Sequence, residues 1–270
     1  MTSEIEPIFN RALKHAFSRK KILFILPGLL LCGLFVVLFH ALAGFAHPWI
    51  GNSLTFLPIF LCAGILMALG IPVIRIYHDE VKHRRVSYTR TVKNSWRLMV
   101  SIASFSIPLV VSYLILWIML GIFYLFKGVP HVGYALGLIF SFGPFLLIFG
   151  SLVLSVVALL LLFFITPQVA LKSAMRWDLA EDLFSRMWKN LFSHLLFLML
   201  GLVPVILVVG FSTLAAALTG MTYFVTERTW AIALQWLFIM IPFAVLISPA
   251  VLFFYNFAAE CFVWMRRHHL

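Results

Sequence analysis

The chain has 270 residues, of which 63% are hydrophobic and only 11% are charged. Soluble domains are roughly 45–50% apolar and about 25% charged, so no water-soluble fold could bury this much apolar surface. The net charge is +11, from 20 basic and 9 acidic residues. The composition therefore excludes a soluble protein and favours an integral membrane protein with a basic surface.

Six uninterrupted apolar runs determine the predicted fold. About 20 apolar residues, each rising 1.5 Å, span the roughly 30 Å hydrocarbon core of a bilayer. The runs are Ile22–Ala46, Leu54–Ile76, Leu98–Phe126, Ala135–Thr166, Leu191–Leu218 and Trp230–Phe257. The first is about twice as long as the apolar region of a signal peptide, so we interpret it as a crossing. We predict an all-α membrane protein with six transmembrane helices, forming one domain over residues 1–270.

The basic residues are concentrated in every second connection between the predicted crossings and in the two terminal segments. Of the 20 basic residues, 5 lie in the N-terminal segment, 7 in 75–97, 4 in 172–189 and 2 in the C-terminal tail. The other connections hold only Lys127 and Arg228. Because lysine and arginine are enriched in cytoplasmic loops, both ends of the chain are predicted to be cytoplasmic. Since these residues flank the crossings, anionic phospholipids of the bilayer are the expected partners, and nucleic acid is not.

A short amphipathic segment precedes each odd-numbered crossing. Apolar residues recur at helical spacing around Phe9 at the N-terminus, Val92 in the second segment and Phe184 in the third. These segments are expected to be helices that lie in the headgroup plane on the cytoplasmic side. Candidate headgroup-binding residues are Arg19, Lys20, Lys21, Arg84, Arg85, Arg90 and Lys93, and candidate interfacial anchors are Phe17, Trp96 and Trp188.

Aligning the segments on their three aromatic anchors brings prolines into register. The alignment predicts a threefold repeat over 1–77, 78–170 and 171–270, each an interfacial helix followed by a helical hairpin. Candidate helix bends are Pro27, Pro72, Pro108, Pro167, Pro204 and Pro249. Proline removes a backbone hydrogen bond, and transporters use broken helices at their binding sites. Static bends are the favoured interpretation, and gating kinks are the alternative.

Two short motifs carry a resemblance to known proteins. Asn94-Ser95-Trp96-Arg97 and Met187-Trp188-Lys189-Asn190-Leu191 each follow a proline-ended crossing and precede the next crossing. With these motifs the chain resembles bacterial six-helix membrane proteins, including the membrane domain attached to some glycerophosphodiester phosphodiesterases. The resemblance implies a fold and a bacterial cytoplasmic (inner) membrane location. It does not imply that activity, because the chain has no phosphodiesterase domain.

Ionisable residues are missing from the middle of every apolar run. Arg75 and Glu260 lie near run ends, where a side chain can extend to the membrane surface. His40 and His47 could share a helical face as a proton-sensing or metal pair, although polar anchoring at the interface is favoured. The crossings therefore show no predicted ion path.

The densest group of possible metal ligands is His78-Asp79-Glu80 with His83. Its order does not match His-Glu-x-x-His, and neighbouring lysine and arginine residues oppose a cation. A Gly-x-Ser-x-Gly elbow is also missing. We predict no catalytic, cofactor-binding or metal site.

The predicted function is that of a non-enzymatic multi-pass membrane protein in envelope organisation, lipid interaction or membrane-complex assembly, with protein partners in the membrane. The alternative is a transporter or permease, or a permease subunit, for a small apolar or amphiphilic substrate. That substrate would move along proline-bent helices without buried charge.

Cysteine substitutions test the predicted orientation. The 18-to-2 charge split places 51–53 outside and both Ser87 and Ser173 in the cytoplasm. In intact cells, an impermeant thiol reagent should label Ser53→Cys and leave Ser87→Cys unlabelled. The reverse pattern would show that the orientation is inverted.

Overall fold

Helices make up the regular structure of the described part of the chain. The computed structural model describes residues 2–46, 48–84, 86–127, 142–172, 191–218 and 229–267. The helices are α1 (Thr2–Lys14), α2 (Arg19–Phe45), α3 (Pro48–Val81), α4 (Tyr88–Ala103), α5 (Ser106–Lys127), α7 (Gly143–Lys172), α9 (Leu191–Leu218) and α10 (Thr229–Arg267). Arg85, Trp188 and most of the third amphipathic segment lie outside the described residues.

Six stretches of the described residues are long and apolar enough to cross a membrane. They lie in α2, α3, α4 with α5, α7, α9 and α10. Helices suit this environment because hydrocarbon offers no hydrogen-bond partners, so every backbone polar group must be bonded within its own segment. The prediction of an all-α protein with six apolar helices of membrane-spanning length is confirmed.

The third predicted crossing is interrupted near its start. The sequence predicts one run over 98–126, but α4 ends at Ala103 and α5 begins at Ser106. Pro108 explains the break, because it has no N–H to donate to the carbonyl of Ser104 and its ring crowds the preceding turn. The hydroxyl of Ser106 donates to the carbonyl of Ala103 at 2.7 Å, which satisfies one acceptor at the break.

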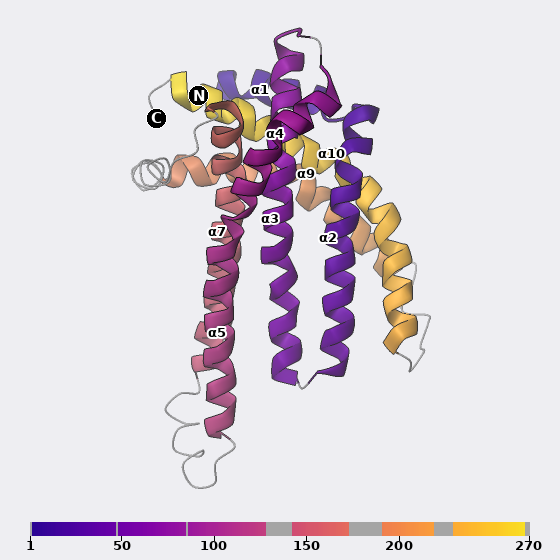
Figure 1. The fold of residues 1–270 in the computed structure, drawn as a ribbon, viewed down its shortest axis with the longest axis vertical. Helices are drawn as coiled ribbons and strands as arrows, with labels where there is room; N and C mark the ends of the chain where they lie inside the picture. The colour runs from indigo at the N-terminus through magenta and orange to yellow at the C-terminus, as the bar shows by residue number, and fades with distance from the viewer. Residues whose placement is uncertain are drawn as a thin grey trace.

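α3 is the central helix of the bundle. It contacts α2, α4, α5, α7 and α10. Figure 1 shows α2, α3, α5 and α7 running along the long axis, with α1 and α4 at one end. The C-terminal part of α10, drawn in yellow, crosses that same end and contacts α1. Three pairs of successive long helices also contact each other: α2 with α3, α5 with α7 and α9 with α10.

The main core surrounds the second half of α10. Every residue of 252–259 is buried, so this part of α10 has protein on all sides. Phe9 of α1 meets Phe253 and Phe257, with ring centroids 4.8 and 6.0 Å away. Ala12, on the same side of α1, is 0% exposed. The apolar side of α1, predicted to face the acyl boundary of the membrane, therefore packs on protein.

Ser53, chosen above as the outer labelling position, is only 5% exposed. Gly51 is partly exposed and Ser87 is exposed, so Gly51→Cys and Ser87→Cys form the better pair for the labelling test. The native cysteines add little background because all three are buried: Cys32, Cys62 and Cys261.

Gly70 allows α3 to approach α7 and α10 closely. A Cβ atom at Gly70 would lie 2.5 Å from Cγ2 of Thr166 and 2.6 Å from Cε1 of Tyr255. Both neighbours are 0% exposed, and the hydroxyl of Tyr255 donates to the carbonyl of Leu66 at 2.7 Å. Since close-packed side chains cannot yield without disturbing others, a methyl group at position 70 would push the three helices apart.

Gly70→Ala is therefore expected to lower the thermal-unfolding midpoint in detergent, because overpacking a core costs about 1–3 kcal/mol. Gly210→Ala on α9 is the matched control, since nothing lies within 4 Å of a Cβ atom at that position. Equal midpoints for the two variants would contradict the close helix contact at Gly70.

Candidate functional site

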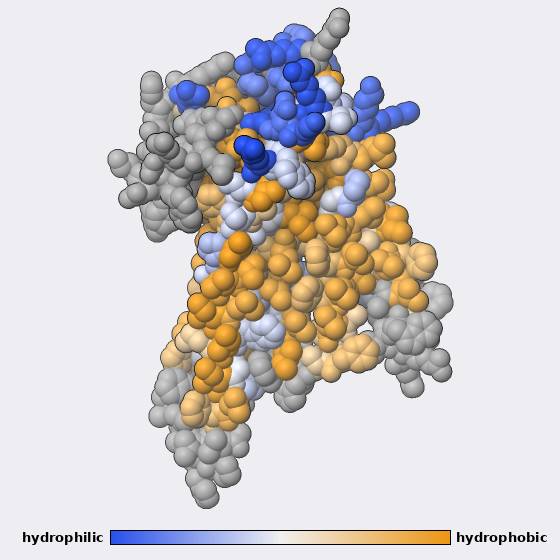
Figure 2. Space-filling model, in the orientation of Figure 1, coloured by the Kyte–Doolittle hydropathy of each residue, from blue (hydrophilic) through white to orange (hydrophobic). Residues whose placement is uncertain are grey.

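Exposed basic side chains gather at the end of the bundle where α1 and α4 lie. Figure 2 shows this end as a hydrophilic cap above an apolar belt. Five of the seven predicted headgroup-binding residues are exposed: Arg19, Lys20, Arg84, Arg90 and Lys93. They come from the start of α2, the residues after α3, and α4. We call these five residues the basic surface.

Two predicted aromatic anchors are also exposed. Phe17, which follows α1, is 65% exposed, and Trp96 on α4 is 60% exposed. Ser95 and Ile102 of α4 are 0% exposed, so Trp96 lies off the side of α4 that packs on protein. Exposed aromatic side chains beside basic residues suit the boundary between headgroups and acyl chains.

Lys21 differs from its two basic neighbours. It is 1% exposed, and its Nζ forms an ion pair with the carboxylate of Glu80 near the end of α3. Nζ also donates to the carbonyl of His15 at 3.3 Å and lies 5.4 Å from the ring centre of Tyr77. An ammonium group held inside the protein in this way does not reach a lipid headgroup. The prediction that Lys21 binds a headgroup is therefore wrong.

A second acidic residue extends this arrangement to α10 and α1. The hydroxyl of Tyr77 donates to Oε1 of Glu260 at 2.7 Å, and Arg11 Nη1 lies 3.6 Å from the same oxygen. His15 Nδ1 lies 3.3 Å from Oε2 of Glu80. Lys21 is the buried charge of this arrangement, whereas the side chains of Glu260, Glu80, His15 and Arg11 are 13, 21, 33 and 50% exposed. A buried charge is tolerated when it has an opposite charge and hydrogen-bond partners, as Lys21 has. The internal polar cluster is defined as Arg11, His15, Lys21, Tyr77, Glu80 and Glu260.

Arg75 connects α3 to two further helices. Its Nε donates to the carbonyl of Ala170 on α7 at 3.0 Å, and its Nη1 donates to Oγ of Ser95 on α4 at 3.0 Å. The sequence predicts that Arg75 and Glu260 extend to the membrane surface. The structure instead shows them bonded to neighbouring helices, and Ser95 is the buried member of the motif that contains Trp96.

A motif search misses the internal polar cluster because its residues come from four separate parts of the chain. One signal was available, since only 9 acidic residues accompany 20 basic ones and Glu80 and Glu260 stand beside long apolar runs. An acidic residue at such a position needs a cationic partner. The sequence cannot say which cation pairs with it, because the pairing depends on how the helices pack.

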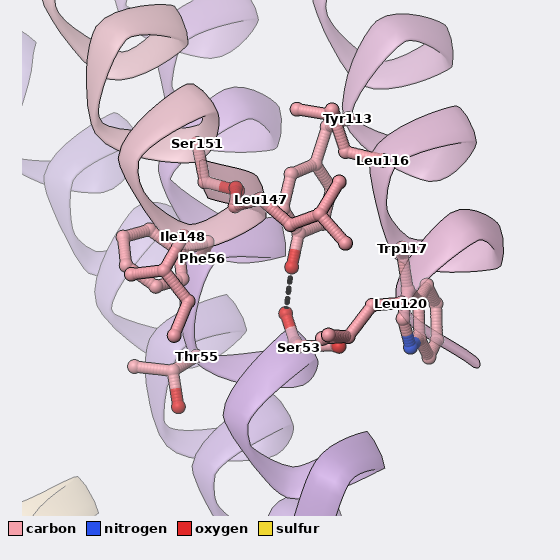
Figure 3. A pocket seen from close by; sticks show the side chains of 10 residues that line it. All are labelled: Ser53, Thr55, Phe56, Tyr113, Leu116, Trp117, Leu120, Leu147, Ile148 and Ser151. Atoms are coloured by element: carbon pink, nitrogen blue, oxygen red, sulfur yellow. Dashed lines mark hydrogen bonds between the residues drawn. The ribbon is translucent and has the colours of Figure 1, made fainter. Parts of the chain in front are cut away.

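A cavity of about 280 Å³ lies between α3, α5 and α7, away from the basic surface. The lining side chains, drawn in Figure 3, are Ser53, Thr55, Phe56, Tyr113, Leu116, Trp117, Leu120, Leu147, Ile148 and Ser151. None of these is charged, and half are aliphatic or phenyl side chains. Figure 3 also shows the hydroxyl of Tyr113 donating to the carbonyl of Ser53. This lining fits a small, mostly apolar molecule.

Four buried side-chain atoms of the described residues have no hydrogen-bond partner. They are Nε1 of Trp117, Oγ1 of Thr166, Oε1 of Gln168 and Oδ1 of Asn256. Leaving a buried polar atom unpaired costs about 1–3 kcal/mol. Trp117 is the one among them that also lines the cavity.

The predicted helix bends all fall within helices. Pro108 stands in the first turn of α5, and the others are internal: Pro27 in α2, Pro72 in α3, Pro167 in α7, Pro204 in α9 and Pro249 in α10. Pro58 and Pro242 are further internal prolines of α3 and α10. Whether these residues bend the helices permanently or take part in gating stays a prediction.

Comparison with known proteins provides no relative. No family model, curated protein or solved structure matches the chain. The resemblance to bacterial six-helix membrane proteins therefore stays a prediction. Within the described ranges, no group of three or more His, Cys, Asp or Glu side chains is placed to hold a metal ion.

Glu80→Gln is expected to destabilise the protein by about 3 kcal/mol, because it leaves the ammonium group of Lys21 buried without its counter-charge. Thermal unfolding in detergent measures the effect, and Lys20→Met, which alters an exposed neighbour, is the control. Lys21→Met in the Glu80→Gln background should recover part of the loss. Strictly additive effects of the two substitutions would contradict the buried pair.

Proposed function

We propose that the chain is a non-enzymatic, multi-pass protein of a bacterial cytoplasmic membrane that binds anionic phospholipids through its basic surface. Its role is in envelope organisation or membrane-complex assembly. The single observation that supports this most strongly is the gathering of five exposed cations at one end of an apolar belt, shown in Figure 2. Each basic residue near an anionic leaflet contributes about 1 kcal/mol of attraction.

In this proposal the basic surface faces the cytoplasm. The sorting of basic residues between alternate connections supports that orientation. So does the placement of α1 and the C-terminal part of α10 at the same end (Figure 1). The proposed arrangement is three hairpins, α2 with α3, α5 with α7 and α9 with α10, each preceded by an interfacial segment.

The internal polar cluster supplies a physical link between bound lipid and the bundle. Arg19 and Lys20 are exposed, whereas the next residue, Lys21, is fixed to Glu80 inside the protein. A headgroup that binds Arg19 or Lys20 therefore contacts the first turn of α2. Lys21 in the same turn is bound to Glu80 of α3. Lipid binding in this proposal stabilises the packing of α2 on α3.

A transporter for a small apolar or amphiphilic substrate is the second candidate function, and the cavity is the observation that favours it. On the side toward the basic surface, however, Phe60, Leu109 and Ala158 pack together between the same three helices. Passage along this route would require those buried side chains to move. Uptake of an apolar dye into proteoliposomes would separate transport from lipid binding.

Replacing all five residues of the basic surface by glutamine should weaken the preference for anionic over zwitterionic lipid in native mass spectrometry. The attraction lost is several kcal/mol at low salt, at about 1 kcal/mol per residue. Salt should weaken the preference of the wild-type protein, because exposed charges are screened.

Thr89→Gln with Asn94→Gln is the matched control, because both positions are exposed on α4 and neither change removes a charge. Unchanged retention of anionic lipid in the five-residue variant would overturn the proposed function.

A further inference from the structure

We propose that Cys32 and Cys62 are a redox modification site, at which a lipid-soluble quinone oxidises the two thiols to a disulfide between α2 and α3. The two sulfur atoms form one bond, and the two thiol protons pass with two electrons to the quinone, which becomes a hydroquinone. The site lies in the apolar part of the bundle and does not involve the basic surface.

The packing of α2 on α3 brings these two cysteines together from positions 30 residues apart in the sequence. Sγ of Cys62 donates to the backbone carbonyl of Cys32 at 3.5 Å, and the two thiol side chains are also within hydrogen-bonding reach of each other. One turn away, the side chain of Leu69 on α3 packs directly on Gly28 of α2. The two helices therefore approach closely at this point, as a disulfide requires.

The middle of the bilayer is the expected depth of the pair. Cys32 is the central residue of α2, whose span Arg19–Phe45 is long and apolar enough to cross a membrane. Both thiols are buried, and the adjacent Leu31 is exposed on the apolar surface of the bundle. Charged groups are costly at this depth, so an oxidant that reaches the pair must be neutral and soluble in hydrocarbon. A quinone meets this requirement and accepts the two electrons and two protons that a thiol pair releases.

A disulfide suits this environment because it is neutral and leaves no polar group that needs a hydrogen-bond partner. A metal ion suits it less. Within the residues that the structure describes, no group of three or more His, Cys, Asp or Glu side chains could hold an ion, so the two sulfur atoms have no third ligand of these types. The third cysteine, Cys261, lies near the C-terminal end of α10 and serves as an internal reference.

Oxidation adds a second link between α2 and α3. The ion pair between Lys21 and Glu80 already joins these helices at the basic end. A disulfide between Cys32 and Cys62 joins them covalently near mid-membrane, so the first half of α2 is held against α3 at two depths. Since a cross-link also restricts the unfolded chain, the oxidised protein should unfold at a higher temperature than the reduced protein.

Counting free thiols by mass spectrometry tests this proposal. The protein in lipid nanodiscs is treated with duroquinone, a neutral quinone whose ring carbons are all substituted, and is then denatured and labelled with N-ethylmaleimide. The untreated protein has three free cysteines and should gain three maleimide groups. After duroquinone it should gain only one, on Cys261, and its thermal-unfolding midpoint should rise.

Matched variants and a second oxidant separate the outcomes. Cys32→Ser and Cys62→Ser should each gain two maleimide groups with or without duroquinone, whereas Cys261→Ser should change from two to none. Ferricyanide, a charged oxidant that stays in water, should leave all three thiols of the wild-type protein free. Three maleimide groups after duroquinone would overturn the inference, and so would oxidation of the pair by ferricyanide. The five-glutamine variant should react as the wild type does, so this test does not depend on the proposed function.

Discussion

The ion pair between Lys21 and Glu80 fixes the geometry of the basic end. Removing a charge from water costs several kcal/mol, so Lys21 remains buried only with Glu80, the carbonyl of His15 and the ring of Tyr77 around it. These groups come from α3 and from the turn after α1, and Glu260 adds α10 to the same arrangement. The positions of Arg19, Lys20 and Arg84 follow, because they lie at or next to the ends of α2 and α3 that the cluster holds together. Arg90 and Lys93 are on α4, which Arg75 of α3 binds through Ser95.

The features that could be predicted from the sequence are those that depend on the bilayer alone. The length of each apolar run is set by the hydrocarbon thickness, and each of the six runs coincides with a helical stretch long and apolar enough to cross a membrane. Pro108 shows the limit of this reasoning, since hydropathy alone does not reveal that one run contains a break between two helices.

Predictions that depend on packing were less successful. Lys20 and Lys21 are neighbours with the same side chain, but Lys20 is exposed and Lys21 is 1% exposed. The difference arises because the rotation of α2 about its axis decides which side chain faces α3. The apolar stripe on α1 was expected to face lipid, but Phe9 of that stripe packs against Phe253. The spacing of apolar residues shows that one face of a helix is shielded from water, but it does not show whether protein or lipid covers that face. The cavity has no sequence signal at all, since its lining comes from three separate helices.

The contact between α1 and α10 has a consequence for how the protein assembles in the membrane. During synthesis α1 leaves the ribosome first and α10 last among the described helices, and segments that emerge early usually begin to fold early. The surface on which Phe9 and Ala12 rest belongs to α10 and does not exist until that helix has been inserted. Until then the apolar side of α1 lacks the protein surface that covers it in the folded structure. Docking of α1 on α10 therefore follows the insertion of the last described helix.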